Sequence, residues 1–436
     1  MRSLLLNLYS VCGLCLYPLA RLAAPFVRRM RGRISVGYAH RLGIYDTEVA
    51  VRNHDCRTIW LHAASVGETQ AALILLKALY AKLDAVQFVF STSTEQGYQL
   101  AKKRVPPNCV CILAPLDVPQ AVDRAIAFFS PSLYLCLETE LWPLMLSKLR
   151  RHTVPILLLN GRISERSLKG YRRLKSLFSS AIQGLRQVAV ITPGDGERFV
   201  ELGIAREKIT VAGNLKFDLP MENEEELAAT RKRLRERLGV GNHERILLCG
   251  STHGGEEEIL CSVFSELSLN VPMVLVLAPR HLERLTAVQN LLHSRHLGHE
   301  RYSQLQGQHR QTPVVLVDTM GDLAELYCAG DFLFCGGSLL PRLSGHNIME
   351  AARWGRPVYF GPYMKDWRDA ASLLTSAGGG FQVEDGPALV KIISCHVQSQ
   401  EAYTRACHMA RETAQKQRGA VLRQIALVED TLYAQN

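Results

Sequence analysis

The sequence predicts an α/β protein with two Rossmann-like, doubly wound domains, preceded by a membrane-anchor helix. Three observations predict this organisation. The chain has 436 residues, which is too long for one ordinary core. Short apolar strand-like segments alternate with helix-like segments in two separate blocks, as is typical of parallel sheets. An uncharged stretch, LLLNLYSVCGLCLYPLA, occupies residues 4–20.

The apolar stretch is followed by basic residues, which are Arg21, Arg28, Arg29, Arg31 and Arg33. A spanning helix needs about 20 apolar residues, so this one spans only by including Arg21, or it lies in the interface. A signal peptide carries its positive charges before the apolar core, whereas here they follow it. Residues 1–33 are therefore predicted as a membrane anchor with a basic flank, and the positive-inside rule places the rest of the chain in the cytoplasm.

The first block, residues 34–212, is predicted as the N-terminal Rossmann-like domain. An amphipathic stretch at 69–83 predicts a helix after the first strand. Strands are expected at 57–62, 86–91, 110–113, 133–137, 156–160 and 188–192.

The second block follows an interdomain linker region at 213–243. Within it, acids and then bases at 222–237 predict a solvated connector helix. Residues 244–436 are predicted as the C-terminal Rossmann-like domain, and we expect its ligands beyond the carboxyl ends of its strands. These strands are expected at 245–250, 273–278, 314–318, 332–336 and 357–360.

Charge and cysteine content narrow the function. Lys and Arg number 51 against 41 Asp and Glu, a net charge of +10 that suits an anionic partner. The body of the chain has no zinc-finger spacing, no RNP-like motif and no long basic tract, so no nucleic acid partner is predicted. The 12 cysteines are scattered. Neither Cys12 with Cys15 nor the Cys-His pairs at 395–396 and 407–408 have further ligands nearby, so we predict no metal site and reduced thiols.

Two acidic motifs follow strands of the first block. In HAASVGE (62–68), Glu68 comes just after a glycine at a strand-to-helix turn, where a carboxylate can act as a general base. The alternative is an acid that only complements the helix dipole. In LETELWP (137–143), Glu138 and Glu140 directly follow an apolar strand, and helix capping is again the alternative.

A lysine marks the junction between the blocks. Lys216 lies in GNLKFD (213–218), where it could stabilise negative charge on a leaving phosphate. The alternative is an ordinary surface lysine.

The second block has several small-residue motifs at predicted strand ends: GSTHGGE (250–256), PRH (279–281), GGS (336–338) and GHNIME (345–350). Their backbone N–H groups suit a phosphate, Arg280 can add a bidentate contact, and Glu350 can accept from a ribose. None is a Walker A motif or a complete G-x-G-x-x-G. Together they predict a nucleotide-binding half.

Over about nine-tenths of its length, the chain resembles the Kdo (3-deoxy-D-manno-octulosonic acid) transferases of lipopolysaccharide synthesis. The motifs that carry the resemblance occur in the family's order: HAASVGE, LETELWP, LNGRISERS, GNLKFD, GSTHGGEEE, APRH, VDTMGDL and GGS…GHNIMEAA. The resemblance implies a GT-B fold whose two domains face a central cleft, and an inverting glycosyltransferase at the cytoplasmic side of a bacterial inner membrane. The implied donor is CMP-Kdo and the implied acceptor is the tetraacylated lipid A precursor, lipid IVA, with no metal and no cofactor.

The same resemblance assigns residues by motif. It makes Glu68 the general base and gives Glu138 and Lys216 a role in stabilising the transition state. The implied CMP-binding residues are Pro279, Arg280, Met320, Gly321, Asp322, Asn347, Ile348, Met349 and Glu350. Two positions depart from the family: Asp322 stands where Glu is common, and the segment 342–344 (Arg-Leu-Ser) replaces a glycine-richer lead into GHN.

Two other functions are compatible with parts of the sequence. The first is a GT-B enzyme that uses a UDP-sugar. Its retaining subgroup pairs two Glu eight positions apart, but the partner of Glu350 would here be Val358. The second is a non-catalytic nucleotide or lipopolysaccharide sensor, which has no need of Glu68, Glu138 and Lys216 together. The number of Kdo units transferred, their linkages and the oligomeric state stay open.

Overall fold

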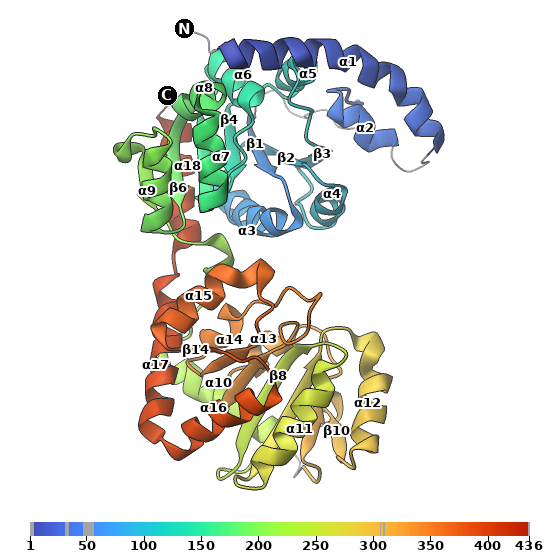
Figure 1. Ribbon diagram of the computed structural model, residues 1–436, viewed down its shortest axis with the longest axis vertical. Helices are drawn as coiled ribbons and strands as arrows, with labels where there is room; N and C mark the ends of the chain where they lie inside the picture. Colours follow the sequence, from blue (N-terminus) through green and yellow to red (C-terminus); the bar gives the residue numbers. More distant parts are fainter. Residues whose placement is uncertain (1–3, 31–34, 47–55, 306, 308–309, 435–436) are drawn as a thin grey trace. The chain divides into compact units, whose positions relative to one another are not determined.

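A computed structural model describes residues 4–30, 35–46, 56–305, 307 and 310–434 (Figure 1). The chain folds into two compact units. Unit 1 comprises Met1–Asp218 and Gly419–Asn436, and unit 2 comprises Leu219–Arg418. Each unit contains one seven-stranded sheet in which all described pairs of strands are parallel.

The sheet of unit 1 has the order β3-β2-β1-β4-β5-β6-β7. Successive residues of β1 belong to the hydrophobic cores on opposite faces of the sheet. Trp60 belongs to the core shared with helices α5, α6, α8 and α9. Leu61 belongs to the core shared with α3, α4 and the C-terminal helix α18 (Ala420–Tyr433). The strands are β1 (Arg57–Ala63), β2 (Val86–Thr92), β3 (Cys109–Leu113), β4 (Leu133–Leu137), β5 (Ile156–Gly161), β6 (Leu185–Val190) and β7 (Ile209–Val211). The helices are α3 (Val66–Lys82), α4 (Glu95–Lys102), α5 (Pro119–Phe129), α6 (Pro143–Arg151), α7 (Glu165–Arg173), α8 (Lys175–Gly184) and α9 (Pro193–Glu201).

The sheet of unit 2 has the order β10-β11-β9-β8-β12-β13-β14. Its strands are β8 (Arg245–Thr252), β9 (Met273–Pro279), β10 (His299–Arg301), β11 (Val314–Leu316), β12 (Phe332–Cys335), β13 (Val358–Phe360) and β14 (Gly380–Gln382). The helices are α10 (Glu224–Arg237), α11 (Glu256–Ser268), α12 (Leu285–Ser294), α13 (Leu323–Leu326), α14 (Met349–Ala352), α15 (Arg368–Ala377), α16 (Gly386–Gln398) and α17 (Gln400–Lys416).

Each predicted strand is present, although β6 begins and ends earlier than the predicted 188–192, and β11 ends two residues before the predicted 318. The sequence prediction missed β7, β10 and β14, which are three-residue strands at the edges of the sheets. Three residues are too few to show the alternation that identifies a strand, and an edge strand is only partly buried.

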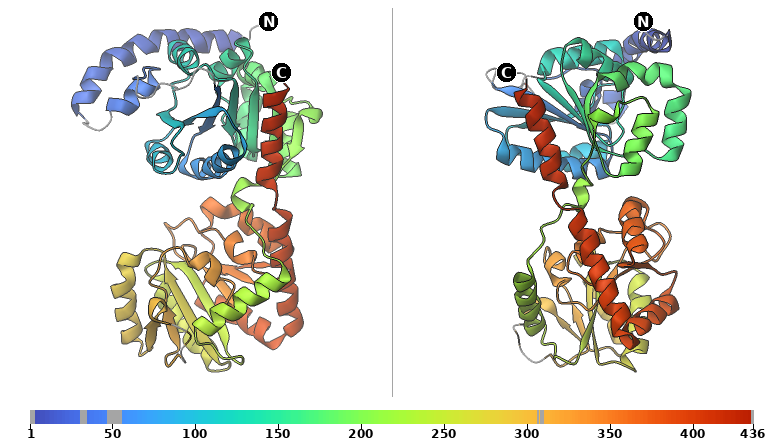
Figure 2. Two further views of the ribbon diagram at one scale, coloured as in Figure 1. Left: turned by 180° about the vertical axis from the view of Figure 1, so that it is seen from behind. Right: turned by 90° about the vertical axis from the view of Figure 1, so that its left-hand side faces the viewer.

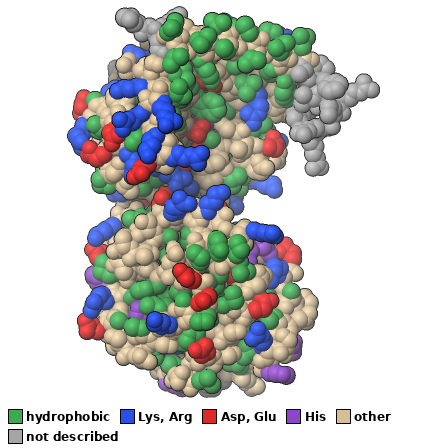
Figure 3. Space-filling model, viewed as in Figure 1, with side chains coloured by type: hydrophobic (Ala, Val, Ile, Leu, Met, Phe, Trp, Pro, Cys, Tyr) green, Lys and Arg blue, Asp and Glu red, His purple; other side chains and the backbone are tan. Residues whose placement is uncertain are grey.

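Helix α1 (Leu4–Met30) belongs to unit 1 and contains, in Leu4–Leu22, the one stretch among the described residues that is long and apolar enough to cross a membrane. A signal sequence meets the same criterion. The hydroxyl of Tyr17 donates to the carbonyl of Leu42 and so fixes α1 to the segment that follows α2 (Ser35–Arg41). Its outer side chains are exposed, among them Leu4, Leu8, Leu16, Leu19 and Leu22. Hydrophobic side chains gather along the top of unit 1, where α1 runs (Figure 3). The basic flank predicted at 28–33 lies outside the described side chains.

The end of the chain departs from the predicted domain boundaries. The prediction gave residues 244–436 to the C-terminal domain, whereas α18 (Ala420–Tyr433) packs on the sheet of unit 1 (Figure 2). Its apolar face buries Ile425, Val428 and Leu432 in the core of that unit. The helical period identifies this face, but it carries no information about which sheet will cover it.

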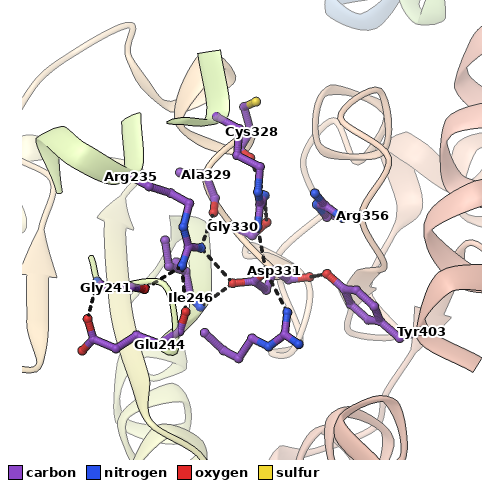
Figure 4. Close-up of polar contacts among 12 residues, drawn as sticks. Arg235, Gly241, Glu244, Ile246, Cys328, Ala329, Gly330, Asp331, Arg356 and Tyr403 are labelled. Carbon is purple, nitrogen blue, oxygen red and sulfur yellow. Dashed lines mark hydrogen bonds and ion pairs between the residues drawn. The ribbon is translucent and has the colours of Figure 1, made fainter. Parts of the chain in front are cut away.

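The predicted solvated connector at 222–237 is helix α10 of unit 2, and it is solvated along most of its length, with Leu234 as its one buried residue. On α10, Arg231 and Arg235 reach the buried carboxylate of Asp331, at 2.7 and 3.1 Å (Figure 4). The same carboxylate accepts from the backbone N–H of Ile246 at 2.8 Å. The pattern of acids followed by bases correctly predicts the helix. It could not indicate that Asp331, about one hundred residues further along the chain, binds the arginines of this helix.

Candidate functional site

Glu68 lies in the first turn of α3, immediately beyond the carboxyl end of β1. Ser65 caps the helix, because its Oγ accepts from the backbone N–H of Glu68 at 3.3 Å. In return, the Glu68 carboxylate accepts from the hydroxyl of Ser65 at 2.9 Å and from the backbone N–H of Ala64 at 2.8 Å. The carboxylate is thereby held in one orientation at the sheet edge.

The environment of Glu68 raises its pKa above the ordinary value. Burial is the main cause, and the negative charges of Glu138 and Glu140 add to it. The hydrogen bonds from Ala64 and Ser65 act in the opposite direction without cancelling the shift. A carboxylate with a raised pKa is a stronger base than an exposed one, so this position suits proton abstraction.

Glu138 follows β4 and is buried. Its backbone has a φ of +55°, a region that non-glycine residues rarely adopt. The carboxylate accepts from Arg162 Nε at 2.8 Å and lies 3.7 Å from Lys216 Nζ. Two cations from different loops therefore converge on one acid at this edge.

Glu140 belongs to a separate group two residues further on. Its carboxylate accepts from Trp142 Nε1 at 2.7 Å and lies 3.6 Å from His62 Nε2, beyond hydrogen-bond length. Burial acts to raise the pKa of Glu140, but the contacts with His62 and Trp142 outweigh it, so the net pKa is below its ordinary value. Glu140 is therefore an anion that acts on Glu68 through its charge.

Lys216 lies in a short 3-10 turn, Leu215–Phe217, after β7. A side chain in place of Gly67 would put its Cβ 3.4 Å from Lys216 Nζ, so the lysine lies directly beside the turn that carries Glu68. The loop is fixed by two side chains to which the sequence analysis gave no role. Asn160 Oδ1 accepts from the N–H of Leu215 at 2.9 Å, and Gln424 Nε2 donates to the carbonyl of Gly213 at 3.2 Å.

The three predicted catalytic residues, two from the first block and one from the junction after it, thus lie together in unit 1. Glu68, Glu138 and Lys216 come from the ends of β1, β4 and β7, which meet at the same edge of a parallel sheet.

In unit 2, the GGS loop has a different partner from the one predicted. The carboxylate of Glu256, which is fully buried, accepts from the N–H groups of Gly337, Ser338 and Leu339 at 2.7–3.0 Å. It also accepts from the N–H of His253 at 3.0 Å. The expectation that the N–H groups of the GGS loop bind phosphate is wrong for these residues, because a carboxylate of the protein already uses them.

The segment 345–350 lies beyond β12, and Arg280, which follows β9, interacts electrostatically with His346 and Glu350 of this segment. Asn347 Nδ2 donates to Glu350 at 3.2 Å, and its Oδ1 accepts from the N–H of Met349. Burial raises the pKa of Glu350, while Asn347, Arg353 and Arg280 lower it by less. Met349 and Ile348 are buried in the core and position this turn without exposing their side chains.

A pair of histidines borders the same segment. His253 Nε2 lies 2.9 Å from His346 Nε2, and their rings are stacked. Burial, the charge of His253 and the charge of Arg280 lower the pKa of His346 to about 4. The pair is therefore a neutral N–H···N contact at physiological pH.

Met320, Gly321 and Asp322 follow β11. The Met320 side chain is 72% exposed, and a Cβ on Gly321 would meet nothing within 4 Å, so this turn is open to a ligand. Asp322 accepts from the hydroxyl of Thr319 in the same turn.

Pro279 ends β9 and is followed by Arg280, whose backbone N–H donates to the carbonyl of Thr252 at 3.0 Å. Within the described residues, no group of three or more His, Cys, Asp or Glu could hold a metal ion.

Sequence reasoning gave no role to Arg162, Asn160 or Gln424, and it included Glu256 only as the last residue of GSTHGGE. Asn160 and Arg162 occur within LNGRISERS, at the end of a strand, which is the one available signal. Gln424 and Glu256 lie on helices, and nothing in their neighbourhood indicates the backbone groups that they contact.

Two Rossmann-like units, each built on a parallel sheet, define the GT-B fold. The fold is similar to the crystal structure of a glycosyltransferase from Rickettsia africae ESF-5, with 15% sequence identity, 87% of this chain and 99% of that chain covered, and a TM-score of 0.50.

The sequence comparisons narrow this class. Residues 37–219 match the family model described as 3-deoxy-D-manno-octulosonic-acid transferase (kdotransferase). The 3-deoxy-D-manno-octulosonic acid transferase of Haemophilus influenzae is 30% identical over 424 residues, which cover 96% of this chain and 95% of that protein. The chain belongs to the Kdo transferase family. A bifunctional glycosyltransferase/methyltransferase of Fusobacterium nucleatum is 33% identical over 339 residues, and the match spans 77% of this chain but only 52% of that longer protein.

Proposed function

We propose that the chain transfers Kdo from CMP-Kdo to lipid IVA, with inversion and without a metal ion, during lipopolysaccharide synthesis. The observation that carries the proposal is the group formed by Glu68, Glu138 and Lys216 at one sheet edge, with a 3.7 Å contact between the lysine and Glu138. Membership of the Kdo transferase family supports the donor and the acceptor class.

The proposed reaction is a single displacement. An acceptor hydroxyl gives its proton to the Glu68 carboxylate, and its oxygen forms a bond to the anomeric carbon of Kdo. The bond between that carbon and the phosphate oxygen of CMP breaks, and the electron pair leaves with CMP. Attack opposite the leaving group inverts the anomeric centre.

Positive charge near the reacting atoms would offset the charge that develops on CMP. Lys216, held beside Glu138, and Arg280 are the cations proposed for this task. Metal independence is part of the proposal because these side chains supply the charge that a divalent ion would otherwise supply. We further propose that CMP is bound by the residues of unit 2 assigned by motif, which are Pro279, Arg280, Met320, Gly321, Asp322, Asn347, Ile348, Met349 and Glu350.

The acceptor carries acyl chains, so the site should work next to a bilayer. The exposed apolar side chains of α1, with Leu4 83% and Leu22 77% exposed, support a helix that inserts into the inner membrane from its cytoplasmic side.

The test uses the purified full-length chain in detergent with CMP-Kdo and lipid IVA. We expect release of CMP that requires both substrates and persists in EDTA, with a lipid product heavier by one or more Kdo units in mass spectrometry. NMR of the product gives the anomeric configuration. Turnover with a UDP-sugar and none with CMP-Kdo would support the rival GT-B reaction instead.

A further inference from the structure

A cavity of about 860 Å³ opens in unit 2 beyond the carboxyl ends of β13 and β14. Three cationic side chains line it: Arg342, Lys365 and Arg368. Hydroxyl groups line it as well, from Ser344, Ser372 and Thr375. No Asp or Glu is among the residues that line this cavity, and within the described chain none of the three cations pairs with a carboxylate. The lining of the cavity therefore combines three cations with neutral hydrogen-bonding groups.

Arg342 has an unusual backbone. Its φ of +81° lies in the left-handed region, which glycine adopts easily and a residue with a long side chain rarely adopts. It belongs to the segment 342–344, which leads directly into GHNIME (345–350). Strained backbone at a non-glycine residue is concentrated at functional sites, because it persists only where its surroundings fix it.

The walls of the cavity are fixed by backbone contacts. The N–H of Asp366 donates to the carbonyl of Ser344 at 3.1 Å, which joins the segment after β12 to the segment after β13. The N–H of Tyr363 donates to the carbonyl of Ser338 at 2.9 Å. A Cβ on Gly345 would come within 2.5 Å of Met364 Sδ, so the two segments are in direct contact. The cavity is therefore preformed rather than a gap between loose loops.

The position of the cavity connects it to the proposed donor site. Ser344 on its wall is three residues before Asn347, the first of the proposed CMP-binding residues of this segment. All strands of the sheet are parallel, so the cavity and the proposed CMP-binding loops lie at the same edge. The wall of the cavity is therefore continuous in sequence with the proposed CMP-binding segment.

We propose that this cavity binds the acidic sugar of the donor and selects it against neutral sugars. The carboxylate of the sugar lies against the guanidinium groups of Arg342 and Arg368 and the ammonium of Lys365. The hydroxyls of the sugar form hydrogen bonds with the serine and threonine side chains of the cavity. This inference rests on the proposed function, whose donor is a CMP-linked sugar acid. A phosphate on the acceptor has the same anionic chemistry, so the test must separate the two sources.

The test compares Arg342→Gly and Arg368→Met with the unmodified chain by steady-state kinetics. Glycine at 342 relieves the backbone strain, so this variant removes the cation without endangering the fold. Loss of a charge-assisted hydrogen bond should raise KM for CMP-Kdo about ten-fold in each variant. The inhibition constant of CMP, which has no sugar, and KM for lipid IVA should each change less than two-fold. Lys391→Met removes an exposed cation of α16 that does not line the cavity and is the matched control.

Three outcomes would overturn the inference: an equal rise in the inhibition constant of CMP, a rise in KM for the acceptor alone, or kinetics unchanged from the control. The first would assign the cations to the nucleotide, and the second would assign the cavity to the acceptor. Turnover of CMP-Kdo by the unmodified chain tests the proposed function separately, so failure of the one is distinguishable from failure of the other.

Discussion

The side-chain carbonyl of Gln424 accepts a hydrogen bond at 2.9 Å from the backbone N–H of Asn160, a residue 264 positions earlier in the chain. Gln424 is fully buried, and Asn160 has a φ of +52°. Together they hold the loop before Lys216 from both sides, through the carbonyl of Gly213 and the N–H of Leu215. The last helix of the chain therefore positions a lysine of the candidate site.

Gln424→Met should lower kcat about ten-fold while leaving KM for CMP-Kdo within two-fold, because it frees the loop that sets the position of Lys216 and leaves unit 2 unchanged. A double-mutant cycle tests whether Gln424 affects kcat through the position of Lys216. In a Lys216→Ala background, the Gln424 substitution should have almost no further effect on kcat.

Thr431→Val is the matched control for this prediction. Thr431 is buried on the same helix, and its hydroxyl has no partner among the described residues. The control should keep full activity. Additive losses in the Lys216→Ala background would show that Gln424 acts on stability rather than through the lysine.

Glu68→Gln should reduce kcat by about 10²–10⁴-fold, which is the usual contribution of a general base. Glutamine keeps the size of the side chain and can still accept from Ser65 or Ala64, so CMP affinity and the thermal midpoint should change little. Single-turnover kinetics with preloaded CMP-Kdo measure the loss, and near-normal rates would remove Glu68 from the mechanism.

The pH dependence of the reaction should respond to Glu140. A base acts only when deprotonated, so kcat/KM should fall as the pH drops through the pKa of Glu68, which burial raises above its ordinary value. The charge of Glu140 raises it further. Glu140→Gln should therefore lower the pKa of Glu68 and move the acid limb of the profile to lower pH. A limb that stays in place or moves to higher pH would contradict this electrostatic coupling.

The position of Glu68 illustrates what the sequence can predict. An apolar strand, a glycine and an acid that opens an amphipathic helix are local features, so they place this carboxylate at a strand end without any knowledge of the fold. Glu138 is predicted in the same way, since it directly follows a predicted strand. Lys216 is predicted only from the GNLKFD motif at the junction between the blocks, because the strand before it, β7, was missed. Parallel order then brings them to one edge.

Contacts between distant segments could not be predicted in this way. The GGS loop has the composition of a phosphate loop, and local reasoning assigned its N–H groups to a ligand. Glu256 uses them instead, from a helix that begins about eighty residues earlier. No local pattern distinguishes an acid that reaches a distant loop from one that only complements its helix dipole. The packing of α18 on unit 1 could not be predicted for the same reason, because an amphipathic pattern does not indicate which sheet the apolar face will contact.

Glu256→Gln should destabilise unit 2 by about 3 kcal/mol, since four backbone donors converge on the two carboxylate oxygens and an amide NH2 would face two of them. Glu258→Gln changes an exposed acid on the same helix and should be nearly neutral. Urea unfolding followed by circular dichroism compares the two variants, and equal midpoints would show that the loop does not depend on this carboxylate.

A similar prediction concerns Asp331, whose carboxylate holds α10 against the rest of unit 2 (Figure 4). Its carboxylate is 3% exposed and lies between Arg231 and Arg235, whose side chains are 17% and 16% exposed. Asp331→Asn keeps an acceptor for the N–H of Ile246 but leaves three guanidinium groups, those of Arg231, Arg235 and Arg245, without their counter-charge. Breaking a buried pair costs about 3–5 kcal/mol. Glu325→Gln breaks the exposed pair with Arg233 on the same helix and should cost less than about 1 kcal/mol. Denaturant unfolding of both variants measures the difference, and equal losses would show that α10 is held by its apolar contacts rather than by Asp331.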